Sequence, residues 1–235
     1  MEECLPDSFG FLDTYQKTAW GQILWEQAET GESLGRIKGK LPKQYMLDGL
    51  DEEINEALVD QDKTEPGYNR FGALVQIAPQ FSAGDITTTA IERHLKEFGD
   101  ISWYMANFLR LHGITFSRVI TPGVAAWELD RVNQPRANRD FALFLEKSMP
   151  WINLAACASQ LKTAAHGVMG VPRDERIIPE QSLFVASGKF TLSMMHIVQT
   201  LFGTTYEAVL ASNTAKLEGR IARGVVFDKE GGDDR

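Results

Sequence analysis

Residues 91–109 read IERHLKEFGDISWYMANFL, and two carboxylates lie inside this largely apolar stretch. Glu97 and Asp100 share one face of the expected helix, because residues i and i+3 of a helix are neighbours. Large apolar side chains surround the two acids, from Leu95 to Leu109, and leave little room for a solvated face. A buried carboxylate without a positive partner costs several kcal/mol. The stretch therefore predicts a buried helix whose two acids meet a cation.

A second acidic pair lies upstream, in GLDEEINEAL (49–58). Glu53 and Glu56 share a helix face, with Glu52 beside them. Two such helices can meet inside a bundle and bring four negative charges together, which hard divalent cations would neutralise. Oxygen ligands favour Mg²⁺, with Mn²⁺ as a substitute, over Zn²⁺. By itself this second stretch favours ordinary solvent-facing charges, and it is the apolar surroundings of the first pair that favour a metal site. The candidate metal ligands are Glu53, Glu56, Glu97 and Asp100.

A cationic segment lies near the end of the chain, SNTAKLEGRIARG (212–224). At helical spacing it places an amide and basic side chains along one face, while Leu217 and Ile221 anchor the other. Cations beside a Mg²⁺ cluster are what a polyphosphate requires. Basic residues also commonly occupy helix C-termini, where they favour the helix dipole, so the segment fits that simpler explanation too. The candidate phosphate-binding residues are Asn213, Lys216, Arg220 and Arg223.

The bulk composition excludes several classes of protein. The chain has 235 residues, a net charge of −8 and a pI near 5.1, which argue against non-specific binding to nucleic acids or anionic membranes. Its two cysteines, Cys4 and Cys157, form no C-x-x-C pair and are expected to be reduced thiols. The N-terminus lacks the pattern of a signal peptide, and no apolar run reaches the length of a membrane span. We therefore expect a soluble, cytoplasmic protein with no nucleic-acid or membrane partner.

The periodicity of the chain predicts helices and no sustained strand, so the expected fold class is all-α, a helical bundle in a single domain over residues 1–235. Stretches rich in Gly and Pro at 62–89 and 170–179 interrupt the helices, and Thr115 and Thr204 follow glycines as expected helix caps. Because 62–89 is long and lies between the two acidic helices, we expect it to be a lid over the ligand. The expected helices are 9–30, 42–61, 88–112, 115–131, 137–148, 150–168, 183–202 and 204–223.

The sequence also contains an internal similarity between two segments. Residues 103–120 and 193–210 align at a constant offset without gaps and share a glycine at the expected helix end. Any helix–Gly–Thr–helix corner gives a similar pattern, so a duplication is one of two interpretations. In a duplication the second copy would be degenerate, because Ser187 and Phe190 stand where the first copy has its acids. The two halves would be a metal-binding copy, 1–135, and a degenerate copy with the closing basic helix, 136–235.

Taken together, these motifs resemble the MazG-like superfamily of all-α nucleoside triphosphate pyrophosphohydrolases, which also includes dimeric dUTPases and phosphoribosyl-ATP pyrophosphohydrolases. The signature of that family, E-E-x-x-E followed by E-x-x-D, stands here as EEINE (52–56) and EFGD (97–100). TYQKTAW (14–20) is similar to the family's opening helix, and SNTAKLEGRIARG with GGDDR is similar to its closing N-x-x-K-L-x-x-R segment and G-D-x-R tail. The matching pieces cover somewhat under half of the chain, in the family's order.

Two features depart from the family pattern. Asn55 stands where a small glycine is common, and the chain between Glu56 and Glu97 is longer than usual. Members of the family dimerise or tetramerise to complete each bundle, so the resemblance allows a homodimer. The internal similarity suggests instead that a second copy completes the bundle within one chain.

By this resemblance, the chain hydrolyses a nucleoside or deoxynucleoside triphosphate between its α- and β-phosphates and releases the monophosphate and pyrophosphate. Mg²⁺ held by the four acids would lower the pKa of a bound water, and Glu52 or Glu53 would accept the proton. Lys216, Arg220 and Arg223 would hold the outer phosphates.

Two other classes of protein use similar acidic helices. A di-iron carboxylate bundle needs E-x-x-H on two helices, which this sequence does not contain. A nucleotide-sensing or partner-binding bundle that keeps the fold without turnover fits Asn55 and the long insertions, and it is the alternative to the hydrolase. The four histidines are scattered and are expected to be structural.

Overall fold

The protein forms a bundle of helices, seen here in a computed structural model. The structure describes residues 13, 15–16, 39–58, 88–116, 118–119, 139–172, 175 and 177–223. Within these residues the chain is all-helical, which confirms the predicted fold class. None of the helices described combines the length and the apolar composition needed to cross a bilayer. The helices are α3 (Pro42–Leu58), α5 (Thr88–Leu111), α7 (Arg139–Met169), α8 (Ile177–Thr200) and α9 (Tyr206–Ala222).

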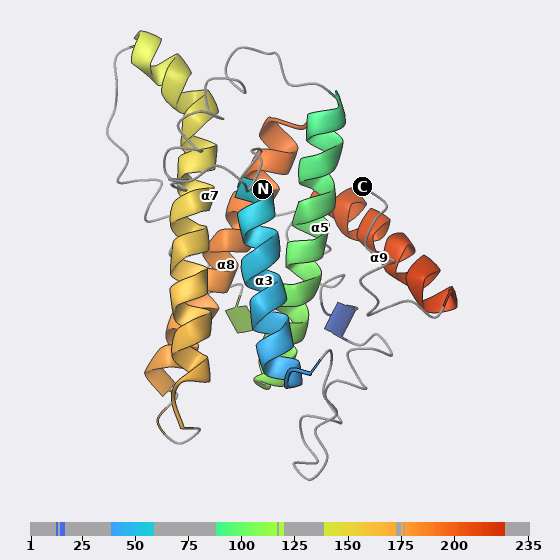
Figure 1. Cartoon of the computed structure of the whole chain (residues 1–235). Coiled ribbons are helices and arrows are strands. Elements are labelled where there is room, and N and C mark those ends of the chain that lie inside the picture. The colour runs from blue at the N-terminus through green and yellow to red at the C-terminus, as the bar shows by residue number, and fades with distance from the viewer. Residues whose placement is uncertain are drawn as a thin grey trace, which may run out of the picture.

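Four of these helices lie side by side as two antiparallel pairs, α3 with α5 and α7 with α8 (Figure 1). Contacts within each pair are the most extensive in the fold, and smaller contacts from α3 to α7 and from α5 to α8 close the bundle. The last helix, α9, lies outside the four and crosses α5 at an angle (Figure 1). The closing segment of the chain is therefore packed on the helix that carries Glu97 and Asp100.

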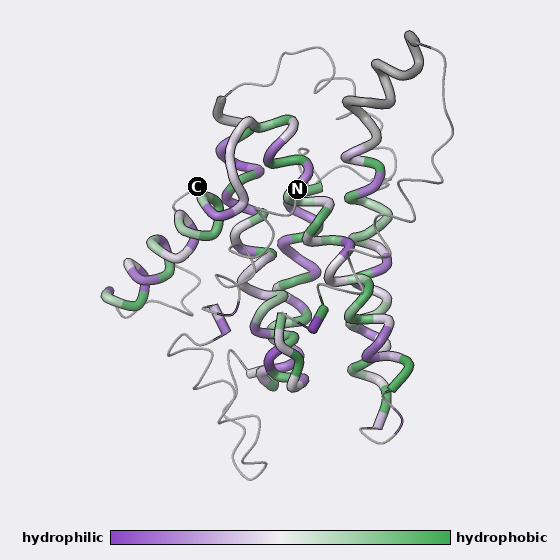
Figure 2. The backbone as a smooth tube through the Cα atoms, turned by 180° about the vertical axis from the view of Figure 1, so that it is seen from behind, coloured by the Kyte–Doolittle hydropathy of each residue, from purple (hydrophilic) through white to green (hydrophobic). Residues whose placement is uncertain are grey.

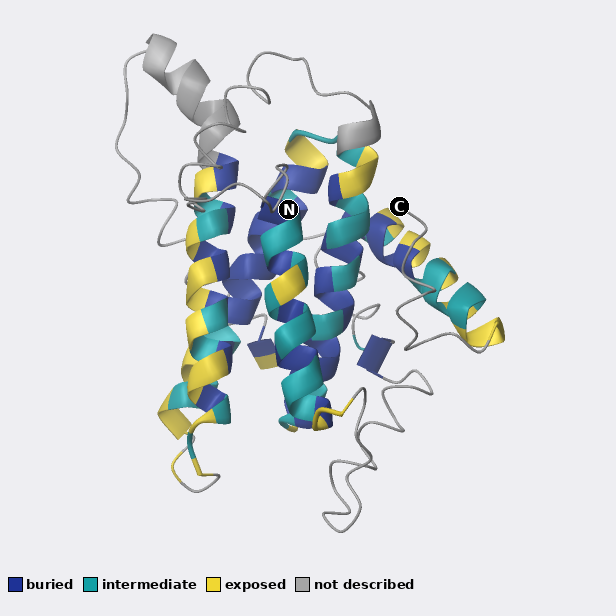
Figure 3. Cartoon of the chain, viewed as in Figure 1, coloured by how far each residue is buried: buried dark blue, intermediate teal, exposed yellow. Residues whose placement is uncertain are grey.

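Burial follows the hydrophobic pattern of each helix. α8 is buried at almost every position from Leu183 to Val198 (Figure 3), as expected of a central helix whose apolar residues lie on all sides. The buried positions also include polar residues such as Ser187 and Lys189. α3 buries only a stripe, which includes Leu50, Ile54 and Leu58. Hydrophilic and hydrophobic residues alternate along the helices of the bundle (Figure 2). The apolar stripe predicted for 49–58 is thus confirmed, and the orientation of the acids on α3 follows from it.

Two prolines make the helix boundaries differ from the prediction. The helices expected at 137–148 and 150–168 are one helix, α7, which contains Pro150. A proline inside a helix removes one hydrogen bond, at about 3 kcal/mol, but here the turns that follow bury Trp151 and Leu154 completely, which offsets this cost. α8 begins at Ile177, earlier than the expected 183, because Pro179 lies in the first turn, where a helix needs no backbone N–H from it.

The ends of α5 and α8 are alike. Gly113 follows α5 with φ 72°, and Gly203 follows α8 with φ 65°, which is the left-handed region where glycine has no steric penalty. The cap of the next helix is shifted by one residue from the prediction. Thr205, rather than Thr204, is the N-cap of α9, and its hydroxyl accepts a hydrogen bond from the backbone N–H of Ala208 at 3.2 Å.

Several predicted features lie outside the described residues. These are the proposed lid up to residue 87, most of the helices expected at 9–30 and 115–131, and residues 59–61 of the helix expected at 42–61.

A close approach of α5 and α9 at Gly99 gives a first testable prediction. A Cβ added at Gly99 would lie 2.8 Å from the Cβ of Asn213, a contact too short for two carbon atoms. Gly99→Ala should therefore push α9 away from α5 and lower the free energy of unfolding by about 1–3 kcal/mol. Gly167→Ala in α7 is the matched control, because nothing lies within 4 Å of its added Cβ. The control should gain about 0.5–1 kcal/mol in denaturant unfolding. Equal effects of the two changes would contradict a close contact at Gly99.

Candidate metal centre

Three carboxylates from two helices meet on the seam between α3 and α5. Glu53 comes from α3, and Glu97 and Asp100 come from α5, and each offers an oxygen within 4.8 Å of the others. All three side chains are half-buried. The structure thus brings together three of the four predicted metal ligands.

The two helices can approach closely here because α3 has a glycine next to this seam. Gly49 lies one turn before Glu53 and faces the ring of Tyr104, and a Cβ at Gly49 would overlap the ring carbon Cε1. Tyr104 in turn lies one turn beyond Asp100 on α5, and its ring centroid is 6.3 Å from that of Tyr45 on α3. The acids are therefore flanked on one side by a pair of packed tyrosines.

The electrostatics of the cluster are unfavourable to three ionised acids. Burial raises the pKa of Glu53 to about 9, helped by a hydrogen bond with Glu97 and by the charges of Asp100, Glu97 and Glu56. Burial also raises the pKa of Glu97, as do the charges of Asp100 and Glu56, while the hydrogen bond with Glu53 and the charge of Lys216 oppose the rise. As the pH falls, the first proton that the cluster takes up is therefore held by Glu53, in its hydrogen bond with Glu97.

The closing helix supplies the positive partner of Asp100. The ammonium group of Lys216 contacts both carboxylate oxygens of Asp100, at 2.5 Å for Oδ2. The side-chain amide of Asn213 donates to Oδ1 of the same carboxylate at 2.5 Å. Two of the predicted phosphate-binding residues are thus in direct contact with a predicted metal ligand, 113 and 116 residues away in sequence.

Tyr15, near the start of the chain, orients Asn213. Its hydroxyl lies 2.8 Å from the carbonyl oxygen of Leu210 and 3.1 Å from Oδ1 of Asn213, and it donates to these acceptors. With its oxygen turned toward Tyr15, Asn213 must present its NH₂ group to Asp100. Tyr15 lies within TYQKTAW, but its role as an orienting residue was not predicted, because nothing local to residue 15 indicates a partner at 213.

The remaining predicted site residues lie around this cluster. Glu56 is close enough to raise the pKa values of Glu53 and Glu97, but it is not among the three acids whose oxygens meet. Glu52 is exposed on α3, and its charge acts on Lys40 and Tyr45. Arg220 lies one turn beyond Lys216 on α9, and Arg223 is the C-cap of that helix. Neither arginine forms an ion pair with a residue that the structure describes. Their roles stay predictions.

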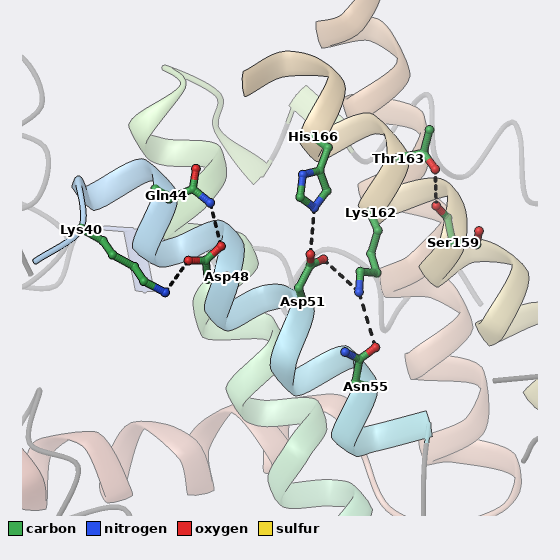
Figure 4. Close-up of polar contacts among 9 residues, drawn as sticks. All are labelled: Lys40, Gln44, Asp48, Asp51, Asn55, Ser159, Lys162, Thr163 and His166. Atoms are coloured by element: carbon green, nitrogen blue, oxygen red, sulfur yellow. Dashed lines mark hydrogen bonds and ion pairs between the residues drawn. The ribbon is translucent and has the colours of Figure 1, made fainter. Parts of the chain in front are cut away.

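A second polar cluster, on the opposite side of α3, was missed by the sequence analysis (Figure 4). Asp51 lies between two residues of α7: its Oδ1 is 3.2 Å from Nζ of Lys162 and its Oδ2 is 2.8 Å from Nε2 of His166. Lys162 also donates to Oδ1 of Asn55 at 3.4 Å. Asn55, which departs from the family pattern, is therefore part of the contact that joins α3 to α7. The one signal in the sequence is the matched spacing, since each helix contributes residues i and i+4.

The donor set fits a hard divalent cation. It contains only carboxylate oxygens, and it comes from two helices held together by a packed core. Burial, together with the charges of the neighbouring acids, raises the pKa values of Glu53 and Glu97. Such a set suits Mg²⁺ or Mn²⁺ and lacks the nitrogen and sulfur ligands that zinc sites commonly use.

Comparison with known proteins adds no relative. No family model, curated protein or solved structure matches this chain. Fold and site together define a class: an all-α bundle with a carboxylate cluster on one helix pair and a lysine of the closing helix bound to that cluster.

Proposed function

We propose that the chain is a Mg²⁺-dependent nucleoside triphosphate pyrophosphohydrolase of the MazG-like, all-α type, which converts a nucleoside or deoxynucleoside triphosphate to the monophosphate and pyrophosphate. The metal ligands in this proposal are Glu53, Glu97 and Asp100, with Glu56 beside them. Asn213 and Lys216 bind phosphate, and Arg220 and the C-cap residue Arg223 extend the basic row to the end of α9.

One observation carries the proposal: Lys216 and Asn213 meet Asp100. The sequence motifs indicated the acids as metal ligands and, beside such a metal cluster, the closing segment as a phosphate site. A site that brings carboxylates and a flexible cation together from distant parts of the chain suits a metal–phosphate complex, in which the metal takes the acids and the lysine takes the phosphate.

The chemistry needs few protein groups. When bound, Mg²⁺ would supply charge that polarises the phosphate and would lower the pKa of a water, so that this water can lose a proton and attack the phosphate. The α3–α5 seam holds the three carboxylates in place, and Lys216 offsets negative charge that develops on phosphate oxygens. Of the two candidate bases, Glu53 lies in the cluster and Glu52 one residue away on the exposed side of α3.

The second helix pair has a structural role in this proposal. α7 and α8 pair as α3 and α5 do, and the two pairs end at equivalent glycines, Gly113 and Gly203. This agreement supports a degenerate second copy that completes the bundle, and the contact of Lys162 with Asp51 and Asn55 holds that copy against α3.

The proposal is tested by product analysis with a panel of nucleoside and deoxynucleoside triphosphates in Mg²⁺. We expect equal amounts of monophosphate and pyrophosphate from at least one nucleotide, and neither product when the metal is chelated. Glu97→Gln and Asp100→Asn should lose this activity, whereas Glu218→Gln, an exposed acid of α9, should keep it. Release of orthophosphate instead would place cleavage at another bond. Nucleotide binding without any product would favour the alternative, a nucleotide-sensing bundle without turnover.

A further inference from the structure

A cleft of about 340 Å³ lies along the seam between α5 and α9, beside the metal centre. The apolar part of its lining comes from Leu95 of α5 and from Ala208 and Val209 of α9. Asn213 and Lys216 also line this cleft, and both contact Asp100. The cleft therefore opens directly onto the residues that the proposed function assigns to phosphate.

The order of residues along α9 indicates which part of a bound nucleotide would lie in the cleft. The cleft takes its α9 lining from the part of the helix between Ala208 and Lys216, whereas Arg220 lies in the last turn and Arg223 is the C-cap. A nucleotide cleaved between its α- and β-phosphates has its nucleoside on one side of the reacting bond and its outer phosphates on the other. With the reacting phosphate at Lys216 and Asp100, the arginines lie on the side for the outer phosphates, and the cleft lies on the other side.

The size and chemistry of the cleft fit the nucleoside. Sites for small organic ligands are typically of about 300–1,000 Å³ and are largely apolar, with a few polar groups that fix orientation. Here the polar residues of the lining include Glu92 and Lys96, one turn apart on α5, and Ser212 on α9. They offer an acceptor, a donor and a group that can do either, which suits the edge of a heterocyclic base and the hydroxyls of a sugar. An acid among the lining groups makes the cleft a poor site for a further phosphate.

We propose that the α5–α9 cleft is the nucleoside subsite, in which the base packs on Leu95, Ala208 and Val209 while the phosphates lie at Lys216 and the metal centre. This inference rests on the proposed function for the position of the phosphates. It assigns the recognition of the base to the seam between the metal-binding helix and the closing helix.

The test fills the cleft from its exposed edge. Ala208 is exposed and lines the cleft, so Ala208→Phe should occupy it without disturbing the core. Ala211→Phe is the matched control, because Ala211 is also exposed on α9 but lies outside the lining. Binding is measured by calorimetry in Mg²⁺ with the α,β-methylene analogues of ATP and UTP, which keep the nucleoside, and with inorganic tripolyphosphate, which lacks it. Ser212→Phe repeats the test from a second position if Ala208→Phe does not fold.

We expect Ala208→Phe to weaken the binding of at least one nucleotide analogue by roughly ten- to a hundredfold, the value of losing one base contact. Tripolyphosphate should bind as before, and Ala211→Phe should change neither affinity. An unchanged affinity for both analogues, an equal loss for tripolyphosphate, or no binding of either analogue to the unaltered protein would overturn the subsite. The proposed hydrolysis can fail separately from the subsite. If Ala208→Phe weakens nucleotide binding but the unaltered protein releases no pyrophosphate, the hydrolysis is rejected and the subsite is kept. If pyrophosphate is released equally by Ala208→Phe and the unaltered protein, only the subsite is rejected.

Discussion

Replacing Glu53 with glutamine is expected to abolish Mg²⁺-dependent turnover and to stabilise the protein by as much as about 3 kcal/mol at pH 7. Burial, the hydrogen bond with Glu97 and the neighbouring acids raise the pKa of Glu53 from 4.5 to about 9 in the folded protein. Between these values the folded protein keeps a proton that the unfolded chain has lost, so the stability of the unaltered protein falls as the pH rises through this window. Each pH unit in the window costs about 1.4 kcal/mol, and a glutamine avoids this cost.

Denaturant unfolding at several pH values measures this effect. The difference in unfolding free energy between Glu53→Gln and the unaltered protein should be small at pH 4.5 and should grow up to about pH 9, following the pKa values of the group. Mg²⁺ should raise the stability of the unaltered protein and not that of the variant, because a bound cation would neutralise the repulsion among Glu53, Glu97 and Asp100. Glu218→Gln, an exposed change on α9, should show neither effect. A difference that does not depend on pH would mean that Glu53 does not hold the proton.

The acidic site could be predicted largely from local sequence, for a physical reason. Glu97 and Asp100 share a face because of their spacing, and the apolar residues around them decide which face turns inward. The stripe of Leu50 and Ile54 likewise fixes the direction in which Glu53 points. Glu56 shares that face but lies one turn further along α3, at the edge of the cluster, and spacing alone does not give that distance.

Contacts between distant helices were less predictable. Asp51 and His166 are 115 residues apart, and pairs at i and i+4 are common on helix surfaces, so their matched spacing does not identify the contact. Pro150 and Pro179 misled the helix boundaries because the effect of a proline depends on its position in the turn and on what the neighbouring residues bury. The meeting of Lys216 with Asp100 was expected through the resemblance of the closing segment and not through any local pattern.

Lys216→Met should tighten the binding of Mg²⁺ and at the same time lower kcat/KM. In the structure the ammonium group of Lys216 lies against both oxygens of Asp100, so a metal that takes this carboxylate must displace it. A charge-assisted contact is worth about 1.5–3 kcal/mol, and its removal should therefore raise the affinity for Mg²⁺ in the absence of nucleotide by roughly ten- to a hundredfold. Turnover should fall by a similar factor, because the same lysine is the proposed partner of the phosphate.

The opposite signs of these two changes separate this role from simple damage to the fold, which would weaken metal binding and turnover together. Lys216→Arg is the matched variant, because it keeps a positive charge beside Asp100 and should leave the affinity for Mg²⁺ close to that of the unaltered protein. Calorimetric titration of Mg²⁺ into the three proteins, followed by steady-state kinetics, gives both quantities. If Lys216→Met bound Mg²⁺ no more tightly than Lys216→Arg, the lysine would not compete with the metal for Asp100. Asn213, which also donates to Asp100, would then be the contact of α9 that matters to the metal ligands.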